Sequence, residues 1–252
     1  MKVRPQVDEQ PAYMIFSHGF GVVYRTMRLM LCVLCVAAPL AHAGRPFVTD
    51  DARIVDKGGC QIETFVKRQR RFDETEVGVN PACNPWGPVE LSLGVARLAS
   101  DTPGDSRALA AQAKALLRPL ETNGLGFAIS IGAARVKAFD TATAVNPYFN
   151  AIGSMSLAGD RVVIHANLGA SRDKAAGVWR GNWGVAAEAL LVAPRLYGVA
   201  EIYGERGEKP TLQGGLRYWL VQDRVQLDAT LGVQKSAPPE RRFHAIGLRV
   251  FW

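Results

Sequence analysis

The chain closes with the stretch Ala245-Ile246-Gly247-Leu248-Arg249-Val250-Phe251-Trp252, in which side-chain character alternates from one residue to the next. Successive side chains of a β-strand point to opposite faces, so every second residue from Ile246 to Trp252 forms one apolar face. Arg249 lies on the other face, and the stretch ends on an aromatic side chain. This pattern predicts a strand with one face toward lipid and the other toward a polar interior.

The same strand carries the features of an outer-membrane assembly signal. Gly247, Val250 and the terminal Trp252 stand at the glycine, apolar and aromatic positions of that signal. Such a strand offers an unpaired edge to which another strand can add. We therefore expect the barrel-assembly machinery and outer-membrane lipid as partners. The alternative is a soluble protein that ends in Trp by chance.

Period-two alternation also governs most of the chain after residue 58. The segments 162–168, 212–220 and 225–231 alternate apolar and polar residues, and turn-like residues separate the strands. The predicted strands that contain such segments run to 10–15 residues, longer than the usual strands of soluble proteins and at least as long as the ~9–11 needed to cross a bilayer when tilted. Twelve strands are predicted, near residues 59–70, 74–83, 88–99, 107–118, 124–136, 146–157, 161–171, 178–192, 195–206, 210–221, 224–235 and 241–252.

These strands predict an all-β fold, a transmembrane antiparallel up-and-down β-barrel of about 12 strands over residues 59–252. Backbone groups in hydrocarbon must all be paired, which only helices and closed barrels achieve. An even strand number places both ends of the barrel at one rim, where the short turns also fall. The competing interpretation is a soluble periplasmic β-sandwich or lipocalin-like barrel. The fourth strand is the weakest prediction, because its alanine- and leucine-rich sequence also favours a helix.

The N-terminal part of the chain resembles an export signal. Residues 27–43 combine a basic Arg28, an apolar run and a small-x-small cleavage site at Ala41-His42-Ala43, which is the pattern of a Sec signal peptide. A membrane anchor is the alternative, although the apolar run is short for a helical span. Residues 1–26 are interpreted as a misassigned extension, or else as a long n-region. Residues 44–58 form either a periplasmic tail or a partial plug of the barrel.

Export to the cell outer membrane of a Gram-negative cell bears on the cysteines. Cys60 and Cys83 are the two that follow the signal peptide, and cysteines in an oxidising periplasm usually pair. A first hairpin centred between Arg71 and Phe72 places Cys60 directly opposite Cys83. The sequence thus predicts a cross-strand disulfide that also tests the register of the first two strands.

Three stretches resemble one known family. They are residues 45–53 followed by 58–63, residues 165–169, and residues 215–219 with 223–230. They are similar to the putative meta-pathway phenol-degradation family of outer-membrane barrels, over most of residues 44–252. The resemblance implies a barrel and a channel or transport role for small molecules, aromatic or apolar ones among them. It supplies no catalytic or binding residues.

Alternation assigns polar side chains from many strands to the barrel lumen. They form either a salt-bridge network that fills a closed structural or surface-interaction barrel, or a polar conduit that selects solutes. The predicted lumen residues are Glu63, Glu90, Lys114, His165, Asn167, Glu188, Glu201, Arg217, Asp228 and Arg249. We expect a small-molecule solute if the conduit is open.

Aromatic residues at the predicted bilayer boundaries are candidates for an interfacial belt. These residues are Trp179, Trp183, Tyr218, Trp219 and Trp252, although alternation turns Trp219 inward.

Other function classes find little support. A lipid-modifying barrel enzyme needs a serine beside a histidine; His165 and His244 are the histidines after the signal peptide, and His165 has Asn167 and Ser171 nearby in the sequence. We therefore expect no enzyme activity and no catalytic residue. Two histidines and a paired set of cysteines also predict no metal and no cofactor. The formal charge of +7 is scattered and carries no nucleic-acid motif, so no nucleic-acid partner is expected.

Overall fold

The computed structural model describes residues 47–69, 73–100, 104–137, 143–174, 176–234 and 241–252. The expected signal peptide at 27–43, the extension at 1–26 and residues 44–46 lie outside this described part. Within it, no helix has the length and apolar character to cross a membrane.

All twelve predicted strands are present, and no boundary differs by more than two residues from its prediction. The strands are β1 (Cys60–Gln69), β2 (Glu74–Cys83), β3 (Val89–Ser100), β4 (Ser106–Arg118), β5 (Leu125–Lys137), β6 (Ala144–Leu157), β7 (Val162–Asp173), β8 (Val178–Val192), β9 (Leu196–Glu205), β10 (Thr211–Val221), β11 (Val225–Gln234) and β12 (Arg241–Phe251). The helix-prone fourth segment is a strand because it pairs along its length with β3 and β5, and such tertiary pairing overrides local propensity.

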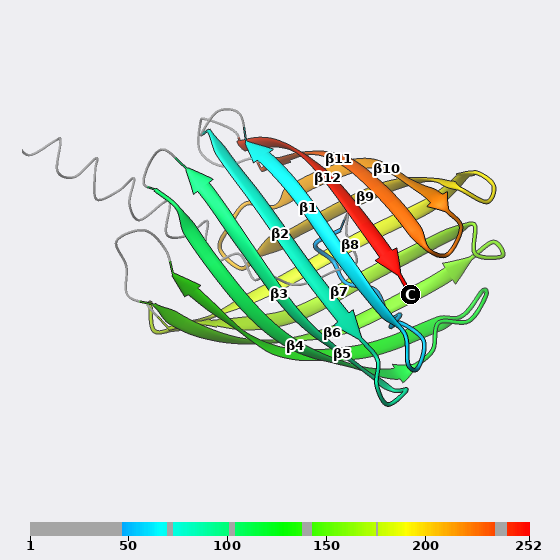
Figure 1. The fold of residues 1–252 in the computed structure, drawn as a ribbon, viewed down its shortest axis with the longest axis horizontal. Coiled ribbons are helices and arrows are strands. Elements are labelled where there is room, and N and C mark those ends of the chain that lie inside the picture. The colour runs from blue at the N-terminus through cyan, green and yellow to red at the C-terminus, as the bar shows by residue number, and fades with distance from the viewer. Residues whose placement is uncertain (1–46, 70–72, 101–103, 138–142, 175, 235–240) are drawn as a thin grey trace, which may run out of the picture. The chain divides into compact units, whose positions relative to one another are not determined.

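The strands form one closed antiparallel barrel (Figure 1). Each strand pairs with its neighbours in sequence, and β1 closes the ring against β12. Gln61 pairs with Phe251, so the start of β1 and the end of the chain meet at one rim. The turns after β2, β4, β6, β8 and β10 lie at this rim, which we call the short-turn rim. The predicted all-β up-and-down barrel is thereby confirmed.

The first hairpin has the predicted register. Cys60 of β1 pairs directly with Cys83 of β2, and the two residues form a disulfide. The bond joins the two strands at the short-turn rim, next to the point where residues 47–59 leave β1. The prediction from the position of the first turn is confirmed.

Hydrogen bonds between side chains and backbone connect neighbouring turns of this rim. Thr122 donates to Asp160 over 2.5 Å, and the backbone N–H of Gly159 donates to the Asn123 side chain over 2.7 Å. Hydrogen bonds from Ser156 and Thr122 hold the pKa of the Asp160 carboxyl below its usual range. The turns after β4 and β6 are therefore held together as one unit.

The two faces of the wall differ in polarity. Outward residues such as Leu168 and Leu231 expose 69% and 71% of their surface, as expected of side chains that contact lipid. Inward residues are mostly polar and buried, and His165 is completely buried. Two small apolar clusters interrupt the polar interior, Phe47 with Ala186 and Val199, and Ala52 with Ala128 and Ile152. Both involve residues that precede β1.

Candidate functional site

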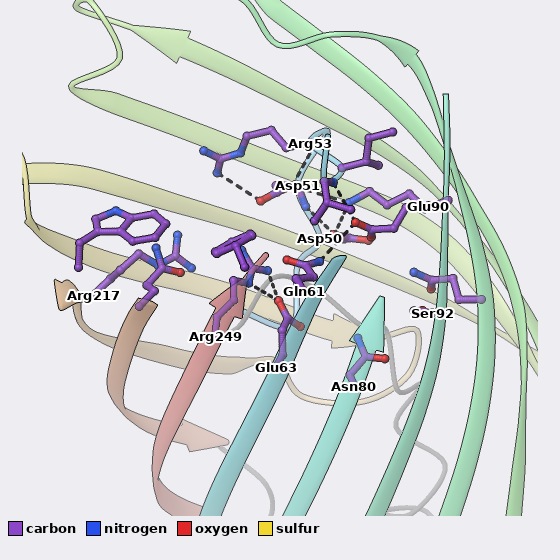
Figure 2. Close-up of a pocket in the computed structure, with 17 residues that line it drawn as sticks. Asp50, Asp51, Arg53, Gln61, Glu63, Asn80, Glu90, Ser92, Arg217 and Arg249 are labelled. Atoms are coloured by element: carbon purple, nitrogen blue, oxygen red, sulfur yellow. Dashed lines mark hydrogen bonds and ion pairs between the residues drawn. The ribbon is translucent and has the colours of Figure 1, made fainter. Parts of the chain in front are cut away.

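Residues 47–57, which we call the lumen segment, lie inside the barrel (Figure 2). The chain enters the lumen from the short-turn rim through Gly58, whose φ of 82° favours glycine. Gly58 donates its N–H to the carbonyl of Asn84 over 2.7 Å, and Gly59 donates to the carbonyl of Asp56 over 2.8 Å. These bonds turn the chain back from β1, so that residues 47–57 run within the barrel.

Side chains of the wall hold the backbone of the lumen segment. Glu201 of β9 accepts hydrogen bonds from the N–H groups of both Val48 and Thr49, the first over 3.0 Å. Farther along, Ser154 Oγ of β6 accepts from the N–H of Ala52 over 2.8 Å. These partners come from strands on different sides of the lumen, so the segment bridges the barrel interior.

Near the short-turn rim the contacts continue with β3 and the turn after β2. Glu90 Oε2 accepts from the N–H of Val55 over 3.0 Å, and Asn84 donates to the carbonyl of Val55 over 2.7 Å. The segment therefore has backbone contacts to the wall at both of its ends.

Asn167 of β7 binds Asp50 from two directions. Its side-chain oxygen lies 2.5 Å from the backbone N of Asp50, and its amide nitrogen donates to the carbonyl of Asp50 over 3.2 Å. A side-chain amide carries both an acceptor and a donor, so it can satisfy both backbone groups of one residue. Asn167 therefore satisfies the backbone of Asp50 on both sides.

Ion pairs add to these backbone contacts. Lys114 Nζ lies 2.8 Å from Asp50 Oδ1, and Arg53 Nη2 lies 2.5 Å from Glu188 Oε1. Asp51 Oδ1 lies 3.7 Å from the same Lys114 Nζ, so the lumen segment contributes two acidic partners and one basic partner to the wall. Buried charges are tolerated when they are paired and hydrogen-bonded in this way.

The wall contains its own ion pairs as well. Arg217 of β10 contacts Glu188 and lies 3.1 Å from Asp228, while Arg249 of β12 contacts Glu63 of β1. Arg217 also lies over the ring of Phe47, with 5.6 Å between the guanidinium carbon and the ring centroid. Glu188 thus connects Arg53 of the segment with Arg217 of the wall, whereas Glu63 and Arg249 form a separate pair.

His165 lies between Ser154 and Glu188. Its Nδ1 atom is 2.8 Å from Ser154 Oγ, and its Nε2 atom is 3.5 Å from Glu188 Oε1. Ser154 and Glu188 lie on β6 and β8, the strands on either side of β7. His165 therefore contacts Ser154 with one ring nitrogen and Glu188 with the other. Ala52 of the lumen segment lies against the serine, because its N–H donates to Ser154 Oγ.

A cavity of about 210 Å³ remains beside the lumen segment. Its size corresponds to several water molecules. Acidic and basic groups line it together with neutral polar side chains, and Trp219 and Phe251 add an aromatic edge with ring centroids 5.9 Å apart. Figure 2 shows Glu63, Arg249, Glu90 and Arg217 around this space. The lumen is therefore only partly filled.

All ten lumen residues predicted from the sequence lie on the inward faces of their strands. The lumen segment brings several of them together: Glu90, Lys114, Asn167, Glu188 and Glu201 contact it through hydrogen bonds or ion pairs, and Arg217 and His165 lie near its Phe47 ring. Sequence reasoning missed Ser154, Asn84 and the segment's own Asp50 and Arg53. Ser154 had a detectable signal, since reflection about the turn after β6 places it opposite His165, as observed.

The aromatic candidates divide between the two faces. Trp179, Trp183, Tyr218 and Trp252 are exposed on the outside, as an interfacial belt requires. Trp219 instead lines the cavity, as expected from the alternation along its strand, which turns this side chain inward. Metal-ligand clusters of three or more His, Cys, Asp or Glu side chains are not found in the described residues.

The chain was compared with protein families, curated proteins and solved structures. The family model described as "Uncharacterised conserved protein UCP029691" matches residues 30–251. No curated protein matches the sequence. The resemblance to the phenol-degradation family stays a prediction.

Several solved structures share the fold. The KdgM porin in complex with disordered oligogalacturonate aligns at a TM-score of 0.56 with 10% identity, over 75% of this chain and 98% of that one. The NanC porin aligns at 0.56 with 6% identity, over 75% and 98%. The β domain of the Bordetella autotransporter BrkA aligns at 0.52 with 15% identity, over 78% and 100%. At these identities the likeness shows the barrel fold alone.

Proposed function

The chain belongs to the family of Uncharacterised conserved protein UCP029691, and we propose that it is an outer-membrane channel for small polar solutes, closed by its own residues 47–57. The location rests on the outward apolar face of the barrel and on exposed Trp252 and Trp179 toward the ends of its strands. Lipid and the assembly machinery would be its membrane partners, the latter through Gly247, Val250 and Trp252.

One observation carries the channel proposal. The lumen segment is attached to the wall by side-chain hydrogen bonds and ion pairs, and it adds no strand to the barrel. It can therefore leave the lumen while every strand-to-strand hydrogen bond stays intact. A twelve-stranded barrel without that segment is wide enough for a narrow aqueous pore.

The chemistry of the lumen favours polar solutes. Paired charges such as Glu63–Arg249 and amides such as Gln61 line the cavity, and both signs of charge are represented. Solutes that exchange hydrogen bonds with such groups are favoured over apolar ones, because apolar solutes leave buried polar groups unsatisfied. The lumen therefore favours polar solutes over the aromatic or apolar molecules that the family resemblance implies.

The test has two parts. Protein extracted from outer membranes is expected to show heat-modifiable gel migration, and the refolded full chain is expected to give discrete openings in planar bilayers and swelling of liposomes in neutral or zwitterionic solutes. A fully soluble periplasmic protein would contradict the location. Absence of both conductance and swelling, also after the segment is displaced, would favour the closed structural barrel instead.

A second candidate function rests on the contact between Ser154, His165 and Glu188. Serine, histidine and an acidic residue in contact are the components of a hydrolase. A substrate would reach Ser154 only after Ala52 leaves it. Ester hydrolysis that requires segment displacement and is abolished by His165→Ala would support this function, and its absence would leave the three residues as a docking contact for the segment.

A further inference from the structure

We infer that the inner wall around the lumen segment is a binding site for the main chain of a short bent peptide, occupied in this structure by the chain's own residues 48–55. The inference rests on the proposed function in one respect, namely that the segment can leave the lumen. It goes further because it assigns a ligand class to the wall. Glu201, Asn167, Ser154, Glu90 and Asn84 form this site.

The contacts at the site are directed at backbone. Glu201, Asn167, Ser154 and Glu90 together accept hydrogen bonds from the N–H groups of Val48, Thr49, Asp50, Ala52 and Val55. Two carbonyl groups of the segment, those of Asp50 and Val55, accept from Asn167 and Asn84. Main-chain hydrogen bonds of this kind give affinity for any peptide in the right conformation.

Two of the wall residues fit a peptide better than other polar ligands. Asn167 satisfies both the N–H and the C=O of one residue, and Glu201 spans two successive N–H groups. A sugar presents hydroxyl groups with other spacing and no run of N–H donors. The site residues accept five hydrogen bonds from N–H groups of the segment and donate two to its carbonyl groups, so both kinds of backbone group are recognised.

Side-chain contacts suggest which peptides bind best. Ala52 is completely buried against Ala128 and Ile152, so a small residue is required there. Arg53 contacts Glu188 one position later, which favours a basic residue. The ligand class is therefore a short peptide that bends as residues 48–55 do and carries a small residue followed by a basic one.

The experiment uses the full chain with Asp50→Lys, because this change sets a lysine against Lys114 and leaves every wall residue unchanged. The probe is a fluorescent peptide with the sequence of residues 48–55, and its binding is followed by anisotropy. We expect binding to the variant at least about tenfold tighter than to the unsubstituted chain, in which the segment competes. Ala52→Leu is the second variant, since a larger side chain at this buried position displaces the segment sterically.

A modified peptide separates backbone from side-chain recognition. N-methylation at the amides that correspond to Thr49, Asp50 and Ala52 removes three donors and keeps all side chains. We expect affinity to fall about tenfold or more, since each hydrogen bond contributes about 0.5–1.5 kcal/mol and 1.4 kcal/mol corresponds to tenfold. A peptide with alanine at the positions of Val48 and Ile54 keeps its amides and is expected to bind within about threefold.

A wall substitution completes the test. Asn167→Asp in the Asp50→Lys background removes the donor to the peptide carbonyl and is expected to weaken binding by about tenfold. Asn150→Asp is the matched control, because Asn150 also faces inward and its partner in β7 is Gly169. Binding that is insensitive to N-methylation, or equal losses for Asn167→Asp and Asn150→Asp, would overturn the inference.

Different results would overturn the channel proposal and the peptide-site proposal. Conductance by the Asp50→Lys variant without peptide binding would overturn the peptide site and leave the channel standing. Peptide binding without conductance or solute uptake would support the peptide site and overturn the channel.

Discussion

Lys114 of β4 holds its ammonium nitrogen 2.8 Å from Oδ1 of Asp50, 64 positions earlier in the chain, and both side chains are about 95% buried. The pair joins the wall of the barrel to the segment that fills it. Arg53 and Glu188 form a second such connection, at 2.5 Å. Charge pairs therefore hold the segment against the wall.

The first prediction concerns this pair. Asp50→Lys places two like charges in contact and removes the nearer of the two carboxylates paired with a buried cation, a change worth about 3–5 kcal/mol. We expect the variant to spend most of its time open, measured as single-channel open probability. Asp50→Lys combined with Lys114→Asp restores opposite charges and is expected to return open probability toward that of the unsubstituted chain. Equal open probability in all three proteins would contradict the role of the pair.

The second prediction concerns ion selectivity. Of the ten lumen residues predicted from the sequence, five carry carboxylates and three carry Lys or Arg charges. The carboxylates are Glu63, Glu90, Glu188, Glu201 and Asp228, and the cations are Lys114, Arg217 and Arg249. The opened lumen is therefore expected to select cations.

Reversal potentials in a salt gradient measure this selectivity for the Asp50→Lys variant. Adding Glu201→Gln removes one carboxylate and is expected to reduce the preference for cations. Anion selectivity of the opened channel would show that the inward charges do not line the path of ions.

The third prediction tests wall packing. An added Cβ at Gly78 of β2 would lie 2.1 Å from the ring of Phe65, its partner in β1. Gly78→Ala is expected to lower the free energy of unfolding by about 1–3 kcal/mol, because the ring must move in a packed lumen. Urea unfolding monitored by heat-modifiable migration gives the measurement.

Gly153→Ala is the matched control for that change. Its added Cβ would have its nearest neighbour at 3.7 Å, an ordinary contact, so the free energy of unfolding is expected to change little. Equal destabilisation by the two substitutions would indicate a general cost of alanine in these strands, and would contradict the specific contact with Phe65.

The strands could be predicted from the sequence because the residue pattern that specifies each strand lies within that strand and its flanking turns. Alternation along β11 and β12 and the turn residues between strands indicate both the elements and their inward faces. The position of the first turn even placed Cys60 opposite Cys83. Each of these inferences uses residues that are neighbours in sequence or in one hairpin.

The contacts of the candidate site could not be predicted in the same way, because they join residues that lie far apart in the sequence. The lumen segment has no periodicity, and its partners lie far along the chain, such as Asn167 at 117 positions from Asp50 and Glu201 at 153 positions from Val48. Alternation in the sequence identifies which side chains face inward, but it does not identify the residues that contact them across the lumen. The sequence of residues 44–58 is therefore compatible with both a periplasmic tail and a partial plug, and it is the contacts of residues 47–57 that place them in the lumen.

A disulfide between the lumen segment and the wall would hold residues 47–57 in place, and would keep the lumen closed if these residues are what closes it. Thr49 Cβ lies 3.2 Å from the position of a Cβ added at Gly184 of β8, close to the Cβ separation in disulfides. Thr49→Cys with Gly184→Cys is therefore expected to crosslink, with Thr49→Cys alone as the control for the reductant. The oxidised protein is expected to show no openings in planar bilayers, and reduction is expected to restore them. Equal conductance before and after reduction would show that residues 47–57 do not close the lumen.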